Sequence, residues 1–202
     1  MDLASLKLKS RTGRIILVRP TEAHDEAVLG LRTHPITRQY LRFFPETLTT
    51  EEVRKIREGR ADNNTCLDFH AHLMDDSGSV GDFVGSTGLF NIDEENNHTD
   101  MGILLSPNVH RGGIGTDILY TLLSYAFDER GFYKVIFETG VDNLNMRGWL
   151  EKVAGATIEG TLRGFWRDLI NGGYSDVLSY SILEDQWRDE VKGKLEKRLG
   201  LL

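Results

Sequence analysis

The sequence lacks the features of a disulfide-rich, multi-cysteine metal-binding or membrane-spanning protein. Its 202 residues include a single cysteine, Cys66, which excludes an internal disulfide framework and a multi-cysteine zinc site. No apolar run approaches the roughly 20 residues that cross a bilayer, and residues 1–10 lack the continuous apolar core of a signal peptide. We therefore expect a cytoplasmic protein without a membrane partner.

Positive charge is also scarce. The chain has 24 basic and 31 acidic residues and a formal net charge of -7. Because nucleic-acid binding needs clustered positive charge, we expect no nucleic-acid partner. The acidic balance is compatible with an amine partner but does not select one, since many enzymes are acidic for solubility alone.

What is present is an ordinary globular composition, with 40% hydrophobic and 27% charged residues. A chain of this length can bury an ample core without metals or disulfides. One domain over residues 1–202, with its core at about 14–187, is the simplest organisation, because no linker or repeat divides the chain.

The hydrophobic pattern predicts an α+β fold with a mixed central sheet of about seven strands and flanking helices. Pro35 is expected to help stop the first helix, and residues 67–105 are expected to form three consecutive antiparallel strands. The predicted helices lie at about 21–31, 50–61, 114–129, 144–153 and 184–200, and the predicted strands at 15–18, 67–73, 82–90, 100–105, from 135, and at 157–166 and 174–183.

A glycine-rich segment, His110-Arg111-Gly112-Gly113-Ile114-Gly115-Thr116, lies between a predicted strand and a predicted helix. A helix N-terminus has unpaired N–H groups and partial positive charge, so it attracts phosphate. Glycines let the backbone approach the anion closely, and Arg111 can add a cation. By itself the pattern is weak, because many such turns contain glycine only for chain reversal.

Two common nucleotide motifs do not fit this segment. No Gly-Lys-Ser/Thr follows the glycines, so the segment is not a Walker-type loop. The three-glycine spacing of the dinucleotide fingerprint is absent, and the preceding strands are predicted to be antiparallel. A different diphosphate-containing ligand therefore remains.

Residues 83–187 resemble the GCN5-related N-acetyltransferase (GNAT) superfamily, and within it the ribosomal-protein-alanine-acetyltransferase-like branch. The family signature is Arg/Gln-x-x-Gly-x-Gly/Ala between the fourth strand and third helix, and residues 110–115 fill it with His110 at the Arg/Gln position. Further blocks follow in family order at 84–89, 100–103, 123–127, 143–155, 160–163 and 173–176. The N-terminal half fits the family only loosely.

The resemblance implies the GNAT acyl-CoA N-acyltransferase fold and acetyl-CoA as cosubstrate. It implies that the backbone of Ile103, Leu104 and Leu105 pairs with the pantetheine arm, as a guest strand does. It also implies that the loop from His110 to Thr116 binds the pyrophosphate. The implied loop residues are His110, Arg111, Gly112, Gly113, Ile114, Gly115 and Thr116.

The chemistry implied is attack of a neutral amine on a thioester carbonyl, which needs a base for the amine proton. Asp100 lies where many relatives have a carboxylate base, although it could equally be an ordinary hairpin residue. Asn143 corresponds to a polar residue that binds pantetheine or orients water, with helix capping as the alternative. The general acid is unassigned, because Met146, Trp149 and Leu150 stand where relatives have Ser or Tyr.

Cys66, Asp68, His70 and His72 are expected on one face of a strand. Successive residues on one face lie roughly 6.5 to 7 Å apart, too far for all four to share one ion. We therefore predict no metal site, and a polar face that lines the acceptor groove.

We predict an N-acetyltransferase that moves acetyl from acetyl-CoA to a primary amine, by direct attack in a ternary complex. The acceptor is a protein N-terminus or a small-molecule amine, and a homodimer is allowed for. One alternative is a non-catalytic acyl-CoA-binding sensor with the same fold, motivated by His110 and the missing acid. A second is a phosphate-sugar or mononucleotide binder that uses the same loop.

Overall fold

A computed structural model describes residues 5–75, 77–110 and 112–202, and the strands in these ranges form one eight-stranded sheet with the order β1-β2-β3-β4-β5-β6-β8-β7. All neighbouring strands pair antiparallel except β5 and β6, which pair in parallel. The sheet is therefore mixed, as predicted. The strands are β1 (Lys7–Lys9), β2 (Ile15–Val18), β3 (Leu67–Met74), β4 (Val80–Asp93), β5 (His98–Leu105), β6 (Lys134–Gly140), β7 (Thr157–Arg167) and β8 (Tyr174–Leu183).

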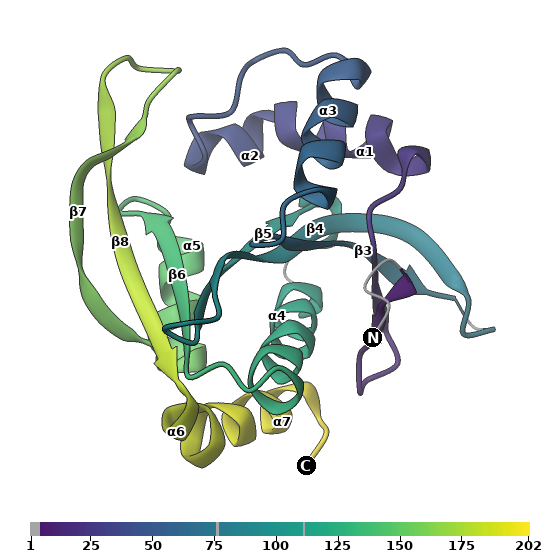
Figure 1. Cartoon of the computed structure of the whole chain (residues 1–202), viewed down its shortest axis with the longest axis vertical. Coiled ribbons are helices and arrows are strands. Elements are labelled where there is room, and N and C mark those ends of the chain that lie inside the picture. The colour runs from purple at the N-terminus through teal and green to yellow at the C-terminus, as the bar shows by residue number, and fades with distance from the viewer. Residues whose placement is uncertain (1–4, 76, 111) are drawn as a thin grey trace.

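Helices cover both faces of the sheet. In Figure 1, α1, α2 and α3 lie above the sheet, whereas α4, α6 and α7 lie below it. The helices are α1 (Asp25–Thr33), α2 (Pro35–Tyr40), α3 (Thr50–Ala61), α4 (Ile114–Ser124), α5 (Leu144–Gly148), α6 (Glu184–Gln186) and α7 (Lys192–Leu199). Short π-helical segments extend α4 to Glu129 and α5 to Ala154, and join α6 to α7. No helix in the described ranges is long and apolar enough to cross a bilayer.

The main hydrophobic core lies between the sheet and α4. Nine of the eleven residues of α4 are buried, including Ile118, Leu122 and Leu123 at full burial. Such an all-round apolar helix needs cover on every side. The sheet covers one side of α4, and the C-terminal helix covers another by packing Trp187 against Phe127 with ring centroids 5.4 Å apart.

β5 and β6 diverge along their length. They pair only from His98↔Lys134 to Asp100↔Ile136, although β5 continues to Leu105 and β6 to Gly140. Beyond Asp100, the edge of β5 that faces β6 therefore has no strand partner. This divergence places an open strand edge in the middle of the sheet, directly before the glycine-rich segment.

Two elements of the N-terminal half were not predicted. β1 adds an eighth strand to the expected seven, pairing Leu8 with Leu17. Pro35 helps to end the first helix as expected, because α1 stops at Thr33 and His34, directly before the proline, is extended. It also begins α2, because a proline at the first helical position needs no N–H partner and has a suitable φ.

Candidate active site

A groove of about 530 Å³ lies beside the open edge of β5, and we call it the β5–α4 groove. It is bounded by the end of β5, the start of α4 and the start of α5. Most of the predicted cofactor-binding residues lie along it, namely Ile103, Leu104, Leu105, His110, Gly113, Gly115, Thr116 and Asn143. Gly112 and Ile114 are not among the residues that line the groove, and Arg111 lies outside the described residues.

The start of α4 has the geometry of an anion-binding site. Gly113 caps the helix with φ 77°, a left-handed conformation that favours glycine. No side chain caps the first N–H groups of α4, so they remain available to an anion. Gly115 lies in the first turn, where an added Cβ would come within 3.4 Å of Leu105 Cδ2. A diphosphate fits this cradle because glycine leaves the backbone accessible.

Arg14 brings a positive charge to the same loop, a role that was not predicted from the sequence. Its Nη1 donates to the carbonyl of Gly112 at 3.3 Å, and its Nε donates to Asp117 at 3.1 Å. Asp117 is fully buried in α4, and burial raises the pKa of its carboxyl despite Thr12 and Arg14. Arg14 therefore ties the β1–β2 turn to the glycine loop, with its guanidinium beside Gly113.

The peptide groups of β5 alternate between its two edges. Ser106 N donates to Val84 on β4 at 2.8 Å, so the peptide groups of Leu105 and Ile103 face away from β4. The carbonyl of Leu105 accepts a hydrogen bond from His110 Nε2 at 3.2 Å, which agrees with this orientation. Ile103 and Leu105 thus turn their main-chain groups towards the open edge, where the Leu105 carbonyl is bound by His110, whereas Leu104 contributes its side chain.

His110 has a structural contact that explains its place in the signature. By donating from Nε2 to Leu105, it links the loop to the end of β5. A long Arg or Gln side chain is not needed for this link, since the imidazole already reaches the carbonyl.

Asn143 caps α5 and also lines the groove. Its Oδ1 accepts from the backbone N–H of Met146 at 3.2 Å, which is the capping role weighed against a functional one. Its amide nitrogen has no hydrogen bond within the described residues. Trp149 Nε1 donates to Thr116 Oγ1 at 3.1 Å and so joins α5 to the start of α4.

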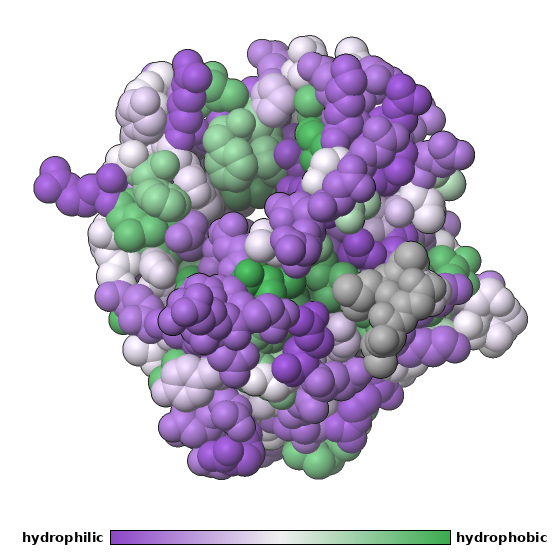
Figure 2. Space-filling view, viewed as in Figure 1, coloured by the Kyte–Doolittle hydropathy of each residue, from purple (hydrophilic) through white to green (hydrophobic). Residues whose placement is uncertain are grey.

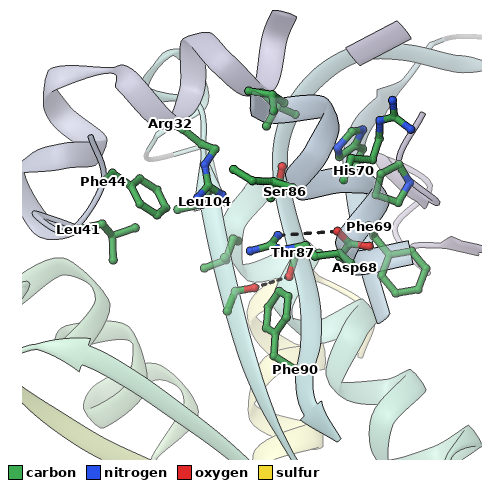
Figure 3. Close-up of a pocket in the computed structure, with 18 of the residues that line it drawn as sticks. Arg32, Leu41, Phe44, Asp68, Phe69, His70, Ser86, Thr87, Phe90 and Leu104 are labelled. Carbon is green, nitrogen blue, oxygen red and sulfur yellow. Dashed lines mark hydrogen bonds and ion pairs between the residues drawn. The ribbon is translucent and has the colours of Figure 1, made fainter. Parts of the chain in front are cut away.

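A second cavity of about 300 Å³ lies between the sheet and α1 and α3, and we call it the α1–α3 pocket. Figure 2 shows a hollow in this part of the surface, below the upper helices. Its floor is the face of the sheet opposite α4, where Asp68 and His70 of β3 and Ser86 of β4 lie (Figure 3). The predicted polar face of β3 therefore lines a pocket through Asp68 and His70.

The α1–α3 pocket and the β5–α4 groove meet at β5. Leu41, Ile103 and Leu104 line both cavities. The two cavities therefore meet along the same short segment of the open edge, a geometry in which two bound molecules can react.

Two carboxylates lie in the α1–α3 pocket close to this junction. Asp100 of β5 and Glu138 of β6 project on the same face, because Thr99, Phe137 and Thr139 fill the buried face. Burial raises the pKa of Asp100, although Asn91 donates to its carboxylate at 2.6 Å. Burial and the nearby charge of Asp100 also raise the pKa of Glu138.

Glu138 was missed by sequence reasoning. It is partly buried and has no hydrogen bond or ion pair among the described residues. The sequence pattern that could have indicated it is an alternation along one strand. Lys134, Ile136 and Glu138 share one face, and the buried Val135 and Phe137 share the other. Nothing local shows that this face meets Asp100, because the contact depends on the pairing of two strands more than thirty residues apart.

Behind the pocket, three histidines pack around Phe83. His70 Nδ1 lies 3.4 Å from His24 Nδ1, and the rings of His24 and His72 are 4.5 Å apart. Burial, followed by the charges of His24 and His72, lowers the pKa of His70 to about 3. No group of three or more His, Cys, Asp or Glu side chains within the described ranges is arranged to hold a metal ion.

This cluster predicts an acid-labile fold. The pKa of His70 is lower in the folded state than its ordinary 6.5, so the unfolded chain binds more protons as the pH falls from about 6.5 towards about 3. The low pKa of His70 can therefore lower the free energy of unfolding by up to about 1.4 kcal/mol for each pH unit in this range. We expect His70→Gln to lose this contribution, so that its free energy of unfolding falls less steeply with pH. Urea unfolding at several pH values measures it, and parallel curves for the two proteins would show that His70 is not responsible.

Comparisons with known proteins agree with this geometry. The model of the acetyltransferase (GNAT) domain family matches residues 14–155. A Bacillus subtilis (strain 168) protein named "Putative ribosomal N-acetyltransferase YdaF" is 26% identical over 179 residues, which cover 87% of this chain and 93% of that protein.

Solved structures share the fold. A GCN5-related N-acetyltransferase from Brucella melitensis has a TM-score of 0.78 at 21% identity, covering 96% of this chain and 85% of its own. Spermidine N-acetyltransferase from Vibrio cholerae, solved in complex with CoA and spermine, has a TM-score of 0.75 at 18% identity, covering 87% and 99% of the two chains.

A mixed sheet that opens after Asp100, with a glycine-capped helix at the opening, is the architecture of an acyl-CoA N-acyltransferase. The chain belongs to the acetyltransferase (GNAT) domain family, whose model matches most of its length. The resemblance predicted from the sequence is confirmed, and the protein is an N-acetyltransferase, an enzyme that transfers acetyl to an amine.

Proposed function

We propose that the protein transfers acetyl from acetyl-CoA, bound in the β5–α4 groove, to an amine bound in the α1–α3 pocket. The observation that carries the proposal is that the two cavities meet at Ile103 and Leu104 of the open edge. A thioester on one side and an amine on the other can then react directly in a ternary complex, without an acyl-enzyme intermediate.

In the groove, we assign the diphosphate to the N–H groups at the start of α4. Gly113 and Gly115 keep this backbone accessible, and Arg14 adds a cation beside it. The peptide groups of Ile103 and the N–H of Leu105, which face the open edge, are the groups we assign to pair with the amide groups of the pantetheine arm. The free amide nitrogen of Asn143 is a further donor to that arm.

In the α1–α3 pocket, we assign the amine to the carboxylates Asp100 and Glu138. They attract the incoming ammonium ion and accept its proton, directly or through water, so that the nitrogen lone pair attacks the thioester carbonyl. The new C–N bond forms, the C–S bond breaks and the thiolate leaves, and the second proton lost by the nitrogen ends on the thiolate, which becomes the free thiol of CoA. A pKa raised by burial makes either carboxylate a better base than it would be in water.

The leaving thiolate does not depend on a strong acid, because an ordinary thiol pKa lies near 8.5. Met146 and Trp149 line the groove where relatives have Ser or Tyr, and neither is an acid. Tyr40 of α2 lines the same groove and carries a phenol, so we assign it as the residue that can donate a proton to the thiolate.

The function is tested by incubating the protein with acetyl-CoA and a panel of peptides, amino acids, polyamines and aminoglycosides. We expect free thiol to appear only when an accepted amine is present, together with the acetylated amine in the mass spectrum. Acetyl-CoA that binds without turnover with any amine would instead indicate an acyl-CoA sensor.

A further inference from the structure

The charges of the α1–α3 pocket are largely paired within the protein. Arg57 of α3 forms two hydrogen bonds with Asp25 of α1, at 2.9 and 3.1 Å. Arg60 lies 3.7 Å from Asp68, which also contacts Arg19 at 3.4 Å. Each of these arginines therefore has a carboxylate partner, and Arg19 and Arg60 share Asp68.

Arg32 is different. Within the described residues its guanidinium has no hydrogen bond and no ion pair, and its Nε is buried without a partner. Its contact is with the ring of Phe44, whose centroid lies 4.2 Å from Cζ. Figure 3 shows Arg32 reaching from α1 into the cavity beside Phe44 and above Leu104.

An unpaired guanidinium in this position costs free energy. Burial, followed by the charge of Arg60, lowers the pKa of Arg32 to about 10, so it is still charged at neutral pH. A charge taken from water without a partner typically costs several kcal/mol. An anion delivered by a ligand would remove this cost, whereas a cation would add to it.

The same pocket also holds negative charge, on Asp100 and Glu138. Glu138 also lacks an ion pair within the described residues, and with Asp100 it forms the acidic part near the junction with the groove. The pocket is therefore dipolar, with unpaired negative charge where the amine must lie and unpaired positive charge at Arg32.

We propose that the acceptor is an amine that also carries a carboxylate, and that Arg32 binds this carboxylate while Asp100 and Glu138 receive the amine. The inference rests on the proposed function and names the substrate class of the same site. The carboxylate belongs either to a free amino acid or to an acidic residue near a peptide N-terminus. A polyamine, which brings only positive charge, is disfavoured at Arg32.

The surroundings of Arg32 suit such an ion pair. Phe43 packs edge to face on Phe44 and on Trp166, with centroids 4.9 and 5.1 Å away. These rings, of which Phe44 is buried, lower the polarity around Arg32, and a charge-assisted hydrogen bond is stronger in such surroundings. The volume of about 300 Å³ is at the lower end of ligand pockets, which fits one residue-sized group.

The test compares matched acceptors by kcat/KM, using thiol release from acetyl-CoA. The pairs are free amino acids with their α-amides, and peptides that begin with Asp or Glu with the same peptides that begin with Asn or Gln. Spermidine is added as an acceptor with positive charge only. We expect the carboxylated member to be better by roughly ten- to a hundredfold, as one charge-assisted contact allows. The free amino acids and the peptides separate the two sources of the carboxylate.

Arg32→Gln is the decisive variant, because it removes the charge and relieves an unpaired cation without threatening the fold. It should abolish the preference for the carboxylated acceptor, mainly through KM, and leave CoA affinity unchanged. The matched control is Arg54→Gln on the exposed face of α3, where Arg54 pairs with Glu51. This control should keep the preference.

The inference is overturned if amides or spermidine are used as well as carboxylated amines, or if Arg32→Gln keeps the discrimination. These outcomes leave the proposed function intact, since turnover still occurs. If no acceptor in the panel caused thiol release, the proposed function would be defeated instead. In that case glutamate should still raise the melting temperature of the wild-type protein and not that of Arg32→Gln. Equal shifts in the melting temperatures of the two proteins would reject the anion site, independently of turnover.

Discussion

Gly115→Glu is expected to abolish CoA binding in a protein that stays folded. Gly115 lies in the first turn of α4, where an acidic residue is favourable to the helix dipole by typically 0.3–1 kcal/mol. The same carboxylate would occupy the anion cradle next to Leu105 and repel the diphosphate. We expect affinity to fall by at least roughly a hundredfold, about 2.7 kcal/mol, in titration calorimetry.

The control for this variant is Gly193→Glu on α7, where an added side chain meets no atom within 4 Å. It adds the same charge away from the groove and should bind CoA like the wild type. Gly113 is less suitable as a probe, because its φ of 77° strains any other residue. Wild-type affinity in folded Gly115→Glu would remove the start of α4 from the binding site.

Asp100→Asn is expected to slow turnover by roughly 10²–10⁴-fold, the usual contribution of a general base, with little change in CoA affinity. Glu138→Gln should have a smaller effect, and the double variant should lose the remaining base catalysis. Steady-state kinetics with thiol detection measures these losses. Asp82→Asn, an exposed carboxylate of β4 outside both cavities, is the matched control.

The pH profile distinguishes a base from a merely structural carboxylate. The raised pKa values of Asp100 and Glu138 mean that protonation removes the base at a higher pH than for exposed carboxylates, so activity falls as the pH is lowered through them. In Asp100→Asn the pKa of Glu138 loses the raising effect of the neighbouring charge. The acid limb should therefore move to lower pH. If Asp100→Asn left both the rate and the acid side of the pH–rate profile unchanged, Asp100 would be an ordinary hairpin residue.

The cofactor side of the site was predictable because its information is local. Residues 110–116 combine a strand end, glycines and a helix start in one continuous segment, and the glycine that caps α4 is one of them. The same continuity allowed Ile103 and Leu105 to be placed on the last strand before the loop. What could not be predicted is that Arg14, from the β1–β2 turn, places a positive charge beside this segment.

The acceptor side was less predictable because it is assembled from distant elements. Asp100 was identified by its position in a family block, but Glu138 is brought to it only by the pairing of β5 with β6. Arg32 reads as an ordinary helical arginine until α1 is seen to lie over the sheet. Arg32 has no hydrogen-bond or ion-pair partner among the described residues, and such an absence cannot be read from a sequence.

Errors in the N-terminal half have local physical causes. β1 is three residues long and is stabilised by pairing with β2, not by its own sequence, so its alternation of lysine and leucine gave a weak signal. Pro35 stops α1, as expected, but the start of α2 at the same residue was not predicted, although proline is also favoured at a helix start. The side chain of His34 accepts from Ile36 N and so caps α2 in that position.

The central claim, that the β5–α4 groove is an acyl-CoA site, is tested most directly by titrating the protein with CoA and acetyl-CoA in competition with ATP and NAD. The account predicts micromolar or tighter binding of both CoA ligands at one site per chain, with no displacement by equal concentrations of ATP or NAD. Failure of CoA to bind at micromolar concentration, or equal competition by ATP or NAD, would contradict it.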